Sequence, residues 1–506
     1  MIYLIRRKAM TNTQFISKAD AYKRPLKKRA VKPARFVEIY RDEEAFQGVA
    51  VRELGDITPV TLMSGDSVIL DFGGHCVGYP SLDLHCVGDN ISDSPTRLKL
   101  SFAEFPLELY ARHGEYNGLL GNGWLQYEEK TAVFTPCTLR VDRRYSFRYM
   151  KIERVDNAPY PMVVESFNAE CVSAVELDSV EKYIAPDERL QRIYDVSLKT
   201  LAECEQEVFE DGPKRDRRLW IGDLRLQAIT DYVTFKNLDL IKRCIYLFAG
   251  YLNSKGEVAP CVYPDCPPYR LEWTFADYSM FLCSCIYDYY KATGDRTLAD
   301  ELYGVAFNQL EMVSSRIEAD LQATADGTFI DWCPSLDKSV ALLGVYAYCL
   351  GQLNEIRADE WLEAEIKKTH ARLRGFLKDG VLVTPLGQVS QHSQVWGALS
   401  GAFDREECRR LLEELDTLDT EYTFRTPYAR HYYIEALVSA GLEDKALSFI
   451  RDFWGMILDA GFDTCPEIFN PDNQFESPYE APEINSACHA WSCTPAYWIK
   501  RLCKEE

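Results

Sequence analysis

The sequence predicts a multidomain α and β chain, in which an N-terminal antiparallel β-sandwich is followed by an (α/α)6 barrel. Three observations predict this class. The length of 506 residues exceeds what one hydrophobic core ordinarily holds. In the first third, apolar residues alternate or form short runs between Gly, Pro, Asn and Asp, as in strands. In the remainder they recur at helical spacing, in about a dozen consecutive segments.

The first element in chain order is a basic segment over residues 1–37. It contains eleven Lys and Arg residues and a single acidic residue, Asp20, and it has no periodic apolar face. Terminal segments of this kind are commonly mobile or loosely docked. We therefore expect a basic N-terminal arm over 1–37 that contributes little to either core.

The β-sandwich is expected over residues 38–180. Three segments show the alternation or the short apolar runs of buried strands: 67–73, 97–104 and 145–153. Turn-forming residues separate them, and short strands at such spacing are typical of an all-β sandwich. We expect this domain to pack on the first helix of the barrel and not to form the floor of a binding site.

The helical period begins after Pro186, and the barrel is expected over residues 181–506. Asp187 is an N-cap candidate for the first helix, in which Leu190 and Leu201 share an apolar face. Twelve helical segments are expected, enough for six hairpins closed into a ring: 187–206, 224–236, 238–251, 275–292, 296–317, 337–353, 358–377, 389–402, 404–416, 427–440, 443–459 and 485–503.

Charge and hydropathy argue against several classes of function. The formal net charge is -21, and so acidic a surface repels nucleic-acid phosphates and anionic lipid. No apolar run approaches the roughly 18 residues that span a bilayer, and the apolar start of the chain is too short for a signal-peptide core. We therefore expect a cytoplasmic protein that binds neither nucleic acid nor membrane, and whose ligand is neutral.

Cysteine usage indicates neither a disulfide framework nor a metal site. The seventeen cysteines lack regular spacing, which is typical of reduced thiols in a chain of this size. The nearest approaches to a metal signature are the His-Cys pairs at 75–76 and 85–86 and the pair Cys261 and Cys266. Neither has the spacing of a structural zinc site, so we expect no metal and no cofactor.

Long polar and aromatic connections separate some of the expected helices and would meet at one end of the ring, where functional residues concentrate. They span 207–223, 253–276, 327–336 and 461–484. The stretch 211–223 holds three aspartates, three arginines, one lysine and one tryptophan. A carboxyl group of raised pKa can protonate a glycosidic oxygen, other carboxylates can bind hydroxyls, and an indole can cover a sugar face. The alternative is a surface ion-pair cluster in which Asp223 only caps the helix 224–235.

Five motifs, in the same order, resemble the active-site motifs of glycoside hydrolase family 78, the bacterial α-L-rhamnosidases. The resemblance covers roughly residue 67 to the end, and its β part looks like the sandwich that precedes the barrel in that family. The motifs are Asp211-x-Pro-x-Arg-Asp with Trp220 and Gly222-Asp223; Trp273 with Asp277; Asp331-Trp332; Cys465-Pro-Glu467; and Asn485-Ser-x-x-His489-Ala-x-Ser492.

The resemblance implies an inverting exo-glycosidase that hydrolyses terminal α-L-rhamnosides or a related deoxy sugar. Asp216 would be the general acid and Glu467 the general base, acting from opposite faces of the sugar. His489 would reach the site from the last helix. The residues implied in substrate binding are Asp211, Arg215, Trp220, Asp223, Trp273, Asp277, Asp331, Trp332 and His489. The partner would be a small-molecule glycoside or an oligosaccharide, and whether the chain forms a homo-oligomer stays open.

One departure from the family pattern keeps other functions open. The acid position is usually glutamate, either directly after the arginine or one residue later, whereas here those positions hold Asp216 and Arg217. The alternatives are another six-hairpin glycosidase, a phosphorylase, and a catalytically impaired sugar-binding homologue. Three further carboxylates compete with Glu467 for the role of base: Glu476, Glu480 and Glu483. Trp273 and Trp332 could instead pack in the core. His489 could instead be a hydrogen-bonded histidine of a helix.

Overall fold

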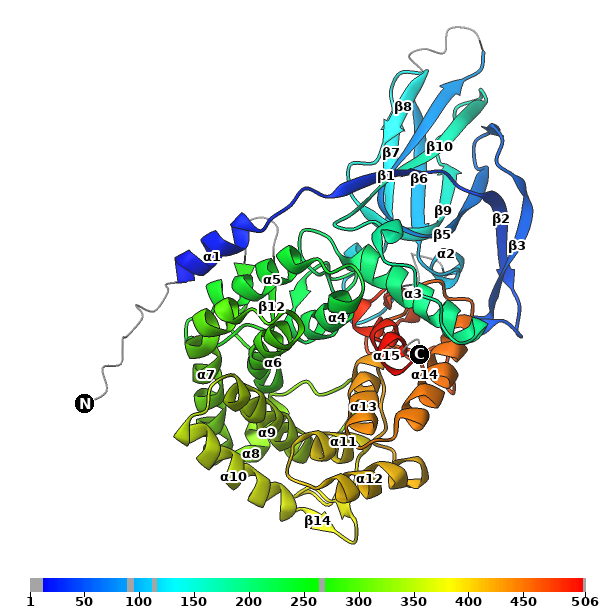
Figure 1. The fold of residues 1–506 in the computed structure, drawn as a ribbon. Coiled ribbons are helices and arrows are strands. Elements are labelled where there is room, and N and C mark those ends of the chain that lie inside the picture. The colour runs from blue at the N-terminus through cyan, green and yellow to red at the C-terminus, as the bar shows by residue number, and fades with distance from the viewer. Residues whose placement is uncertain (1–11, 89–94, 112–115, 264–268, 504–506) are drawn as a thin grey trace.

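The structure is a computed structural model that describes residues 12–88, 95–111, 116–263 and 269–503. Figure 1 shows a β-domain of blue and cyan strands above a ring of helices whose colour runs from green to red. The two parts correspond to the predicted β-sandwich and (α/α)6 barrel. Among the described residues, no helix has the length and apolar character needed to cross a membrane.

In its described residues, the β-domain contains ten antiparallel strands and one short α-helix, α2 (Leu107–Tyr110). The strands are β1 (Lys27–Val31), β2 (Arg35–Arg41), β3 (Val49–Asp56), β4 (Val60–Leu62), β5 (Ser67–Cys86), β6 (Thr96–Ala103), β7 (Tyr127–Ala132), β8 (Cys137–Arg140), β9 (Tyr145–Arg154) and β10 (Met162–Ser173).

The long strand β5 belongs to both layers of this domain. Its first part, residues 69–71, pairs with β2 on one side and β9 on the other, whereas residues 81–84 pair with β8 and β10. Leu70 and Leu82 therefore pack in one core together with Leu100 of β6 and Phe147 of β9. The alternating and apolar runs read from the sequence supply this core, and the predicted antiparallel sandwich is confirmed.

The N-terminal segment differs from the predicted arm in its described part. Helix α1 (Asn12–Ala21) packs on α5, with Phe15 and Ala19 buried, and β1 extends the sheet beside β10. Phe15 and Ala19 lie one turn apart, so a short apolar face exists after all. The basic side chains meet acidic partners on the rest of the molecule, for example Lys18 with Glu301 at 2.5 Å. Residues 1–11 of the predicted arm lie outside the described residues.

Twelve helices of the described chain form two concentric rings (Figure 1). The inner ring contains α4 (Ile221–Val233), α6 (Ala276–Thr293), α9 (Ser339–Ile356), α11 (Gln391–Leu399), α13 (Pro427–Ser439) and α15 (Pro495–Leu502). The outer ring contains α3 (Glu188–Cys204), α5 (Leu238–Gly250), α7 (Arg296–Ala319), α10 (Glu360–Arg374), α12 (Arg405–Glu413) and α14 (Glu443–Asp459). A short helix not predicted, α8 (Leu321–Asp326), follows α7.

Two helix starts differ from the prediction in a way that matters for the site. Helix α4 begins at Ile221 and not at 224, so Asp223 lies in its first turn and does not cap it. The last helix begins at Pro495 and not at 485, because Pro495 occupies a first-turn position that proline favours. His489 consequently lies in the preceding loop, at the N-cap of a short 3-10 turn, and not on the last helix.

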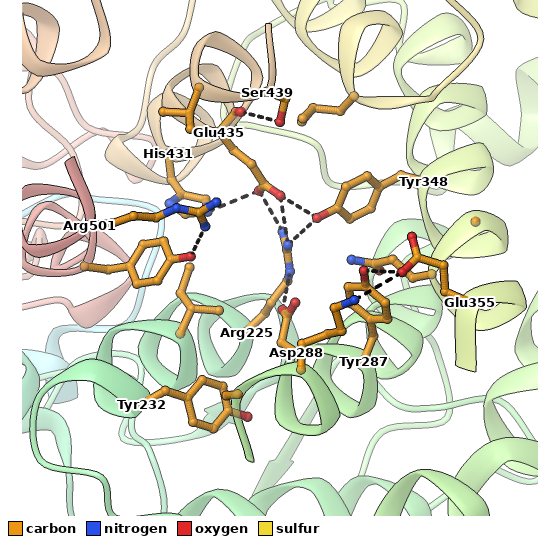
Figure 2. Close-up of a pocket in the computed structure, with 18 of the residues that line it drawn as sticks. Arg225, Tyr232, Tyr287, Asp288, Tyr348, Glu355, His431, Glu435, Ser439 and Arg501 are labelled. Atoms are coloured by element: carbon orange, nitrogen blue, oxygen red, sulfur yellow. Dashed lines mark hydrogen bonds and ion pairs between the residues drawn. The ribbon is translucent and has the colours of Figure 1, made fainter. Parts of the chain in front are cut away.

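The inner helices run in the same direction, and their C-terminal halves enclose a cavity of about 640 Å³. Figure 2 shows Arg225 at its centre, between Asp288, Glu435 and Tyr348. The Arg225 guanidinium donates to Asp288 Oδ2 at 3.1 Å and to Tyr348 Oη at 2.5 Å, and it pairs with Glu435 at 3.3 Å. The predicted site residues Asp223 and Asp277 occupy the first turns of α4 and α6, so they lie toward the opposite end of the barrel.

Candidate active site

Two loops that are far apart in the sequence interlock at the N-terminal end of the inner helices. Loop A (residues 205–218) connects α3 to the strand before α4, and loop B (residues 460–494) connects α14 to α15. The Ala490 amide donates to the Asp211 carbonyl at 3.0 Å, and Ser486 Oγ donates to the Arg215 carbonyl at 3.0 Å. Lys214 Nζ donates to a further carbonyl of loop B, that of Asn485, at 2.9 Å. The two loops therefore form one rigid unit.

Arg215 bridges the two candidate catalytic carboxylates. Its guanidinium donates to Glu467 Oε2 at 2.7 Å and lies 3.4 Å from Asp216 Oδ1. Tyr479 supports the same group, since its ring lies 4.1 Å from the guanidinium carbon and its hydroxyl donates to Glu467 Oε1. The Asp216 side chain is 17% exposed, whereas that of Glu467 is 4% exposed. Asp216 thus borders solvent, and Glu467 lies deeper in loop B.

Asp211 and Asp223 are buried beside this pair. Asp211 accepts the amides of Asp216 at 3.2 Å and of Arg218 at 3.0 Å, which fixes the turn of loop A that carries Asp216. Burial and the neighbouring charge of Asp216 raise the pKa of Asp211 to about 8. Burial, together with the charges of Asp211 and Glu467, raises the pKa of Asp223 well above its usual range. The environment of both carboxyl groups therefore favours their protonated form.

His489 faces Asp223 across the cluster. Its Nδ1 lies 3.6 Å from Asp223 Oδ1, and neither atom has a hydrogen-bond partner among the described residues. Burial and the nearby charge of Arg215 lower the pKa of His489 to about 3, so the imidazole is neutral at physiological pH. Buried polar atoms normally find a partner, and two such atoms side by side can accept and donate to a ligand hydroxyl.

Aromatic rings form a continuous wall around these polar groups. Tyr278 lies between Trp220 and Phe329, with ring centroids 6.4 and 5.5 Å away. The wall continues from Phe329 to Trp332 at 5.3 Å and from Trp332 to Tyr479 at 5.9 Å. The Trp220 Nε1–H is buried without a hydrogen-bond partner among the described residues. The wall is therefore apolar, with a polar donor that a ligand can use.

Gly222 allows the wall to approach α4. A Cβ at this position would lie 2.6 Å from the Tyr278 ring, so a larger residue would displace that ring.

The sequence analysis did not identify three residues of this wall: Tyr278, Phe329 and Tyr479. No local signal marked them, because each acquires its role through a contact between loops. Trp273 is exposed and packs on Phe275 at 5.0 Å, and Trp332 is likewise exposed, so neither is a core residue.

Asp277 and Asp331 contact the protein itself. Asp277 accepts the amides of Phe329 at 3.1 Å and Ile330 at 2.9 Å. Asp331 accepts four hydrogen bonds, from the amides of Trp332 and Arg425 and from the side chains of His392 and Thr426. Burial opposes ionisation of Asp331, but these donors lower its pKa below the usual value. The geometry gives both carboxylates a supporting role in the loop that carries Phe329 and Trp332.

The three competing carboxylates of loop B have no described contact with Arg215. Glu476 pairs with Arg425 at 3.7 Å and accepts a hydrogen bond from Asn470. Glu480 is exposed, and the Glu483 carbonyl accepts from Lys214. Among the described contacts, only Glu467 of these four carboxylates touches Arg215, so the geometry favours Glu467 as the partner of Asp216.

The β-domain reaches this end of the barrel. It contacts α3 as expected, with Ser173 Oγ donating to the Ala202 carbonyl at 2.7 Å. It also supports both loops, because Glu104 accepts the Ala487 amide at 2.6 Å and Glu108 pairs with Lys214 at 2.8 Å. The β-domain therefore lies behind the site, without supplying the carboxylates.

Two family models match this chain and together cover most of it. Residues 33–171 match the glycosyl hydrolase family 78 alpha-rhamnosidase N-terminal domain. Residues 184–502 match the bacterial alpha-L-rhamnosidase six-hairpin glycosidase domain. The junction falls where the structure passes from β10 to α3.

Solved structures show the same architecture. A rhamnosidase from Klebsiella oxytoca, with rhamnose bound, is 35% identical with a TM-score of 0.93, and the match covers 97% of this chain and 99% of that one. The GH78 rhamnosidase of Bacillus sp. GL1 is 18% identical with a TM-score of 0.72, over 90% of this chain and 50% of that one. This second likeness concerns the fold alone.

Among curated proteins, an alpha-L-rhamnosidase of Alteromonas sp. (strain LOR) is 23% identical over 291 residues. That match covers 56% of this chain and 29% of the relative, so the matched segment is a minor part of that longer protein.

Proposed function

The chain belongs to glycoside hydrolase family 78, and from this premise we propose that it is an exo-acting glycosidase that hydrolyses terminal α-L-rhamnosides with inversion at the anomeric carbon. One observation carries the proposal. The Arg215 guanidinium contacts both Asp216 and Glu467, which belong to different loops. A pair of carboxyl groups at the scissile bond is common to inverting and retaining glycosidases, and inversion is what the family resemblance implies.

In the proposed reaction, Asp216 acts as the general acid. It donates its proton to the glycosidic oxygen as the bond between that oxygen and the anomeric carbon breaks. Glu467 removes a proton from a water molecule that attacks the anomeric carbon from the opposite face. The products are free sugar and the protonated leaving group. Asp216 regains its proton from solvent, to which its side chain is 17% exposed.

The remaining polar groups would bind and position. The neutral His489 and the protonated Asp223 can exchange hydrogen bonds with sugar hydroxyls, because both present an unpartnered atom on the same side. Asp211 would act through Asp216 as a positioning residue, since its oxygens are engaged by loop A amides. Asp277 and Asp331 would position the aromatic loop and not the sugar.

The apolar wall supports a deoxy sugar as substrate. Rhamnose carries a methyl group where other hexoses carry a hydroxymethyl group, and burying one methyl against aromatic rings is worth roughly 0.8 kcal/mol. Trp220, Phe329 and Trp332 provide such a surface. Six-hairpin barrels also serve other glycosidases and phosphorylases, so the substrate must be tested directly.

A screen of aryl glycosides tests the proposal. We expect turnover of 4-nitrophenyl α-L-rhamnoside, and much slower turnover of the α-L-fucoside and the α-L-arabinoside. Turnover of another glycoside in preference would replace the sugar assignment. Binding of rhamnose without turnover of any glycoside would instead identify a catalytically impaired sugar-binding homologue.

A further inference from the structure

A second arginine contacts the other carboxylate oxygen of Asp216. Arg215 lies at Oδ1 of Asp216, whereas Arg218 lies 3.4 Å from Oδ2. The Arg218 guanidinium carbon is 4.3 Å from the ring centre of Tyr263 and 5.9 Å from that of Trp124. Tyr263 ends the short strand β12 (Cys261–Tyr263) of the barrel domain, and Trp124 belongs to the β-domain. Two domains thus place aromatic rings around one guanidinium.

The stereochemistry of the proposed reaction determines where the leaving group must lie relative to Asp216 and Glu467. The water activated by Glu467 attacks the face of the sugar opposite to the leaving group, and Asp216 protonates the leaving oxygen. The leaving group must therefore lie beside Asp216 and away from Glu467. Arg218 and its two aromatic neighbours lie at Oδ2 of Asp216, whereas Arg215, which holds Glu467, lies at Oδ1.

Trp124 is held firmly enough to define a binding surface. Leu119, five residues before Trp124, donates its amide to the Tyr479 carbonyl at 2.9 Å, and Tyr479 is the residue that hydrogen-bonds Glu467. Leu125, next to Trp124, packs in a small core with Ala481 and Ile484 of loop B. The β-domain segment is therefore fixed to the loop that carries the proposed base.

We propose that Trp124, Tyr263 and Arg218 form a leaving-group subsite that accepts an aromatic aglycone. This inference rests on the proposed hydrolase function. Indole, phenol and guanidinium groups all stack on aromatic rings, and the charge of Arg218 is already opposed by Asp216. The β-domain thereby contributes to selectivity although it supplies neither carboxylate.

Two substrates with the same sugar separate this subsite from the sugar site. 4-Methylumbelliferyl α-L-rhamnoside has an aromatic leaving group, whereas α-L-rhamnosyl fluoride releases only fluoride. One stacking contact corresponds to roughly a tenfold change in affinity or less. For Trp124→Ala we expect the ratio of kcat/KM for the aryl substrate to that for the fluoride to fall about 10-fold. Trp124→Leu keeps apolar volume without the indole face and should lower the same ratio if the alanine variant folds poorly.

Matched variants complete the test. Trp332→Ala, on the wall beside Tyr479, should lower kcat/KM for both substrates by the same factor. Phe134→Ala, at a β-domain residue that is 67% exposed, should change neither. An unchanged ratio in both folded Trp124 variants would overturn the inference. If the unaltered protein hydrolyses neither substrate, the proposed function itself fails, and the leaving-group subsite falls with it.

Discussion

Arg215 donates a hydrogen bond of 2.7 Å to Glu467, although 252 residues separate them in the sequence. The same guanidinium lies 3.4 Å from Asp216. The contact ties the start of the barrel domain to its end and brings the two proposed catalytic carboxylates to one group. The proposed hydrolysis depends on this arrangement.

Neutral replacements of the two carboxylates should each remove most of the activity. Asp216→Asn cannot protonate the leaving oxygen, and Glu467→Gln cannot accept a proton from water. A positioned acid or base typically contributes about 100- to 10,000-fold to the rate. We expect kcat for 4-nitrophenyl α-L-rhamnoside to fall in that range, with unchanged circular dichroism. Near-full activity of Glu467→Gln would transfer the role of base to Glu476, Glu480 or Glu483.

Removing the bridging charge should cost both stability and activity. Arg215→Met leaves the buried Glu467 without its ion-pair partner, and breaking a buried pair typically costs about 3–5 kcal/mol. We expect denaturant unfolding to show a loss of that order, together with a strong drop in kcat. The matched double variant Arg215→Met with Glu467→Gln should recover part of the stability but none of the activity. A stable and fully active Arg215→Met protein would refute the bridging role.

The opposite end of the barrel provides a separate prediction. Arg225→Met would leave Asp288 and Glu435 facing each other in the cavity of Figure 2 without their shared cation. Loss of about 3–5 kcal/mol in the free energy of unfolding is expected. KM for the aryl rhamnoside should stay unchanged in the folded variant, because the partners of Arg225, Asp288 and Glu435, lie in the C-terminal halves of α6 and α13. A changed KM with unchanged stability would contradict that separation.

A buried carboxyl pair predicts how stability depends on pH. Burial raises the pKa of Asp231 to about 7, and burial and the Asp231 charge raise that of Glu205 as well. A raised acid pKa means that the folded state holds the proton more tightly than the unfolded chain, in which an aspartate titrates near 3.9. The stability contributed by this proton is complete below about pH 4, declines as pH rises and is lost above about pH 7.

The neutral variant Asp231→Asn isolates this contribution. Its amide oxygen can still accept the Asn237 amide, which Asp231 accepts at 2.7 Å. We expect the Tm of the unaltered protein to decrease more steeply between pH 5 and pH 7.5 than that of the variant, by differential scanning fluorimetry. Parallel profiles of the two proteins would show that the pair does not titrate in this range.

Local patterns in the sequence were enough to predict the two domains. The change of period after Pro186 separates them, and Asp187 caps α3 as predicted, accepting the Leu190 amide at 2.9 Å. The prediction of a loosely docked N-terminal arm was wrong for its described part. The many charged residues of this segment obscure a short apolar face, which is buried because α1 packs on α5. The predicted start of the last helix at 485 was wrong because Pro495 favours the first turn of a helix, which places the start of α15 at Pro495.

The candidate site was only partly predictable. Acidic and aromatic residues marked loop A, and the family resemblance added Glu467 and His489. The structure brings these residues together with Arg215. No sequence pattern marked Tyr479, Phe329 or Trp124 as site residues, because each contributes through a contact between segments that are distant in the chain. The family resemblance implied Asp277 and Asp331 as substrate-binding residues. In the structure, their carboxylate oxygens accept hydrogen bonds from the protein.

The stereochemistry of the first-formed product tests the central claim most directly. If Asp216 protonates the leaving oxygen while Glu467 activates water on the opposite face, one displacement inverts the anomeric carbon. Proton NMR of the reaction with an α-L-rhamnoside should then show the β-anomer of rhamnose first, with the α-anomer appearing only through mutarotation. Initial release of the α-anomer would contradict the account, even if rhamnose proved to be the sugar released.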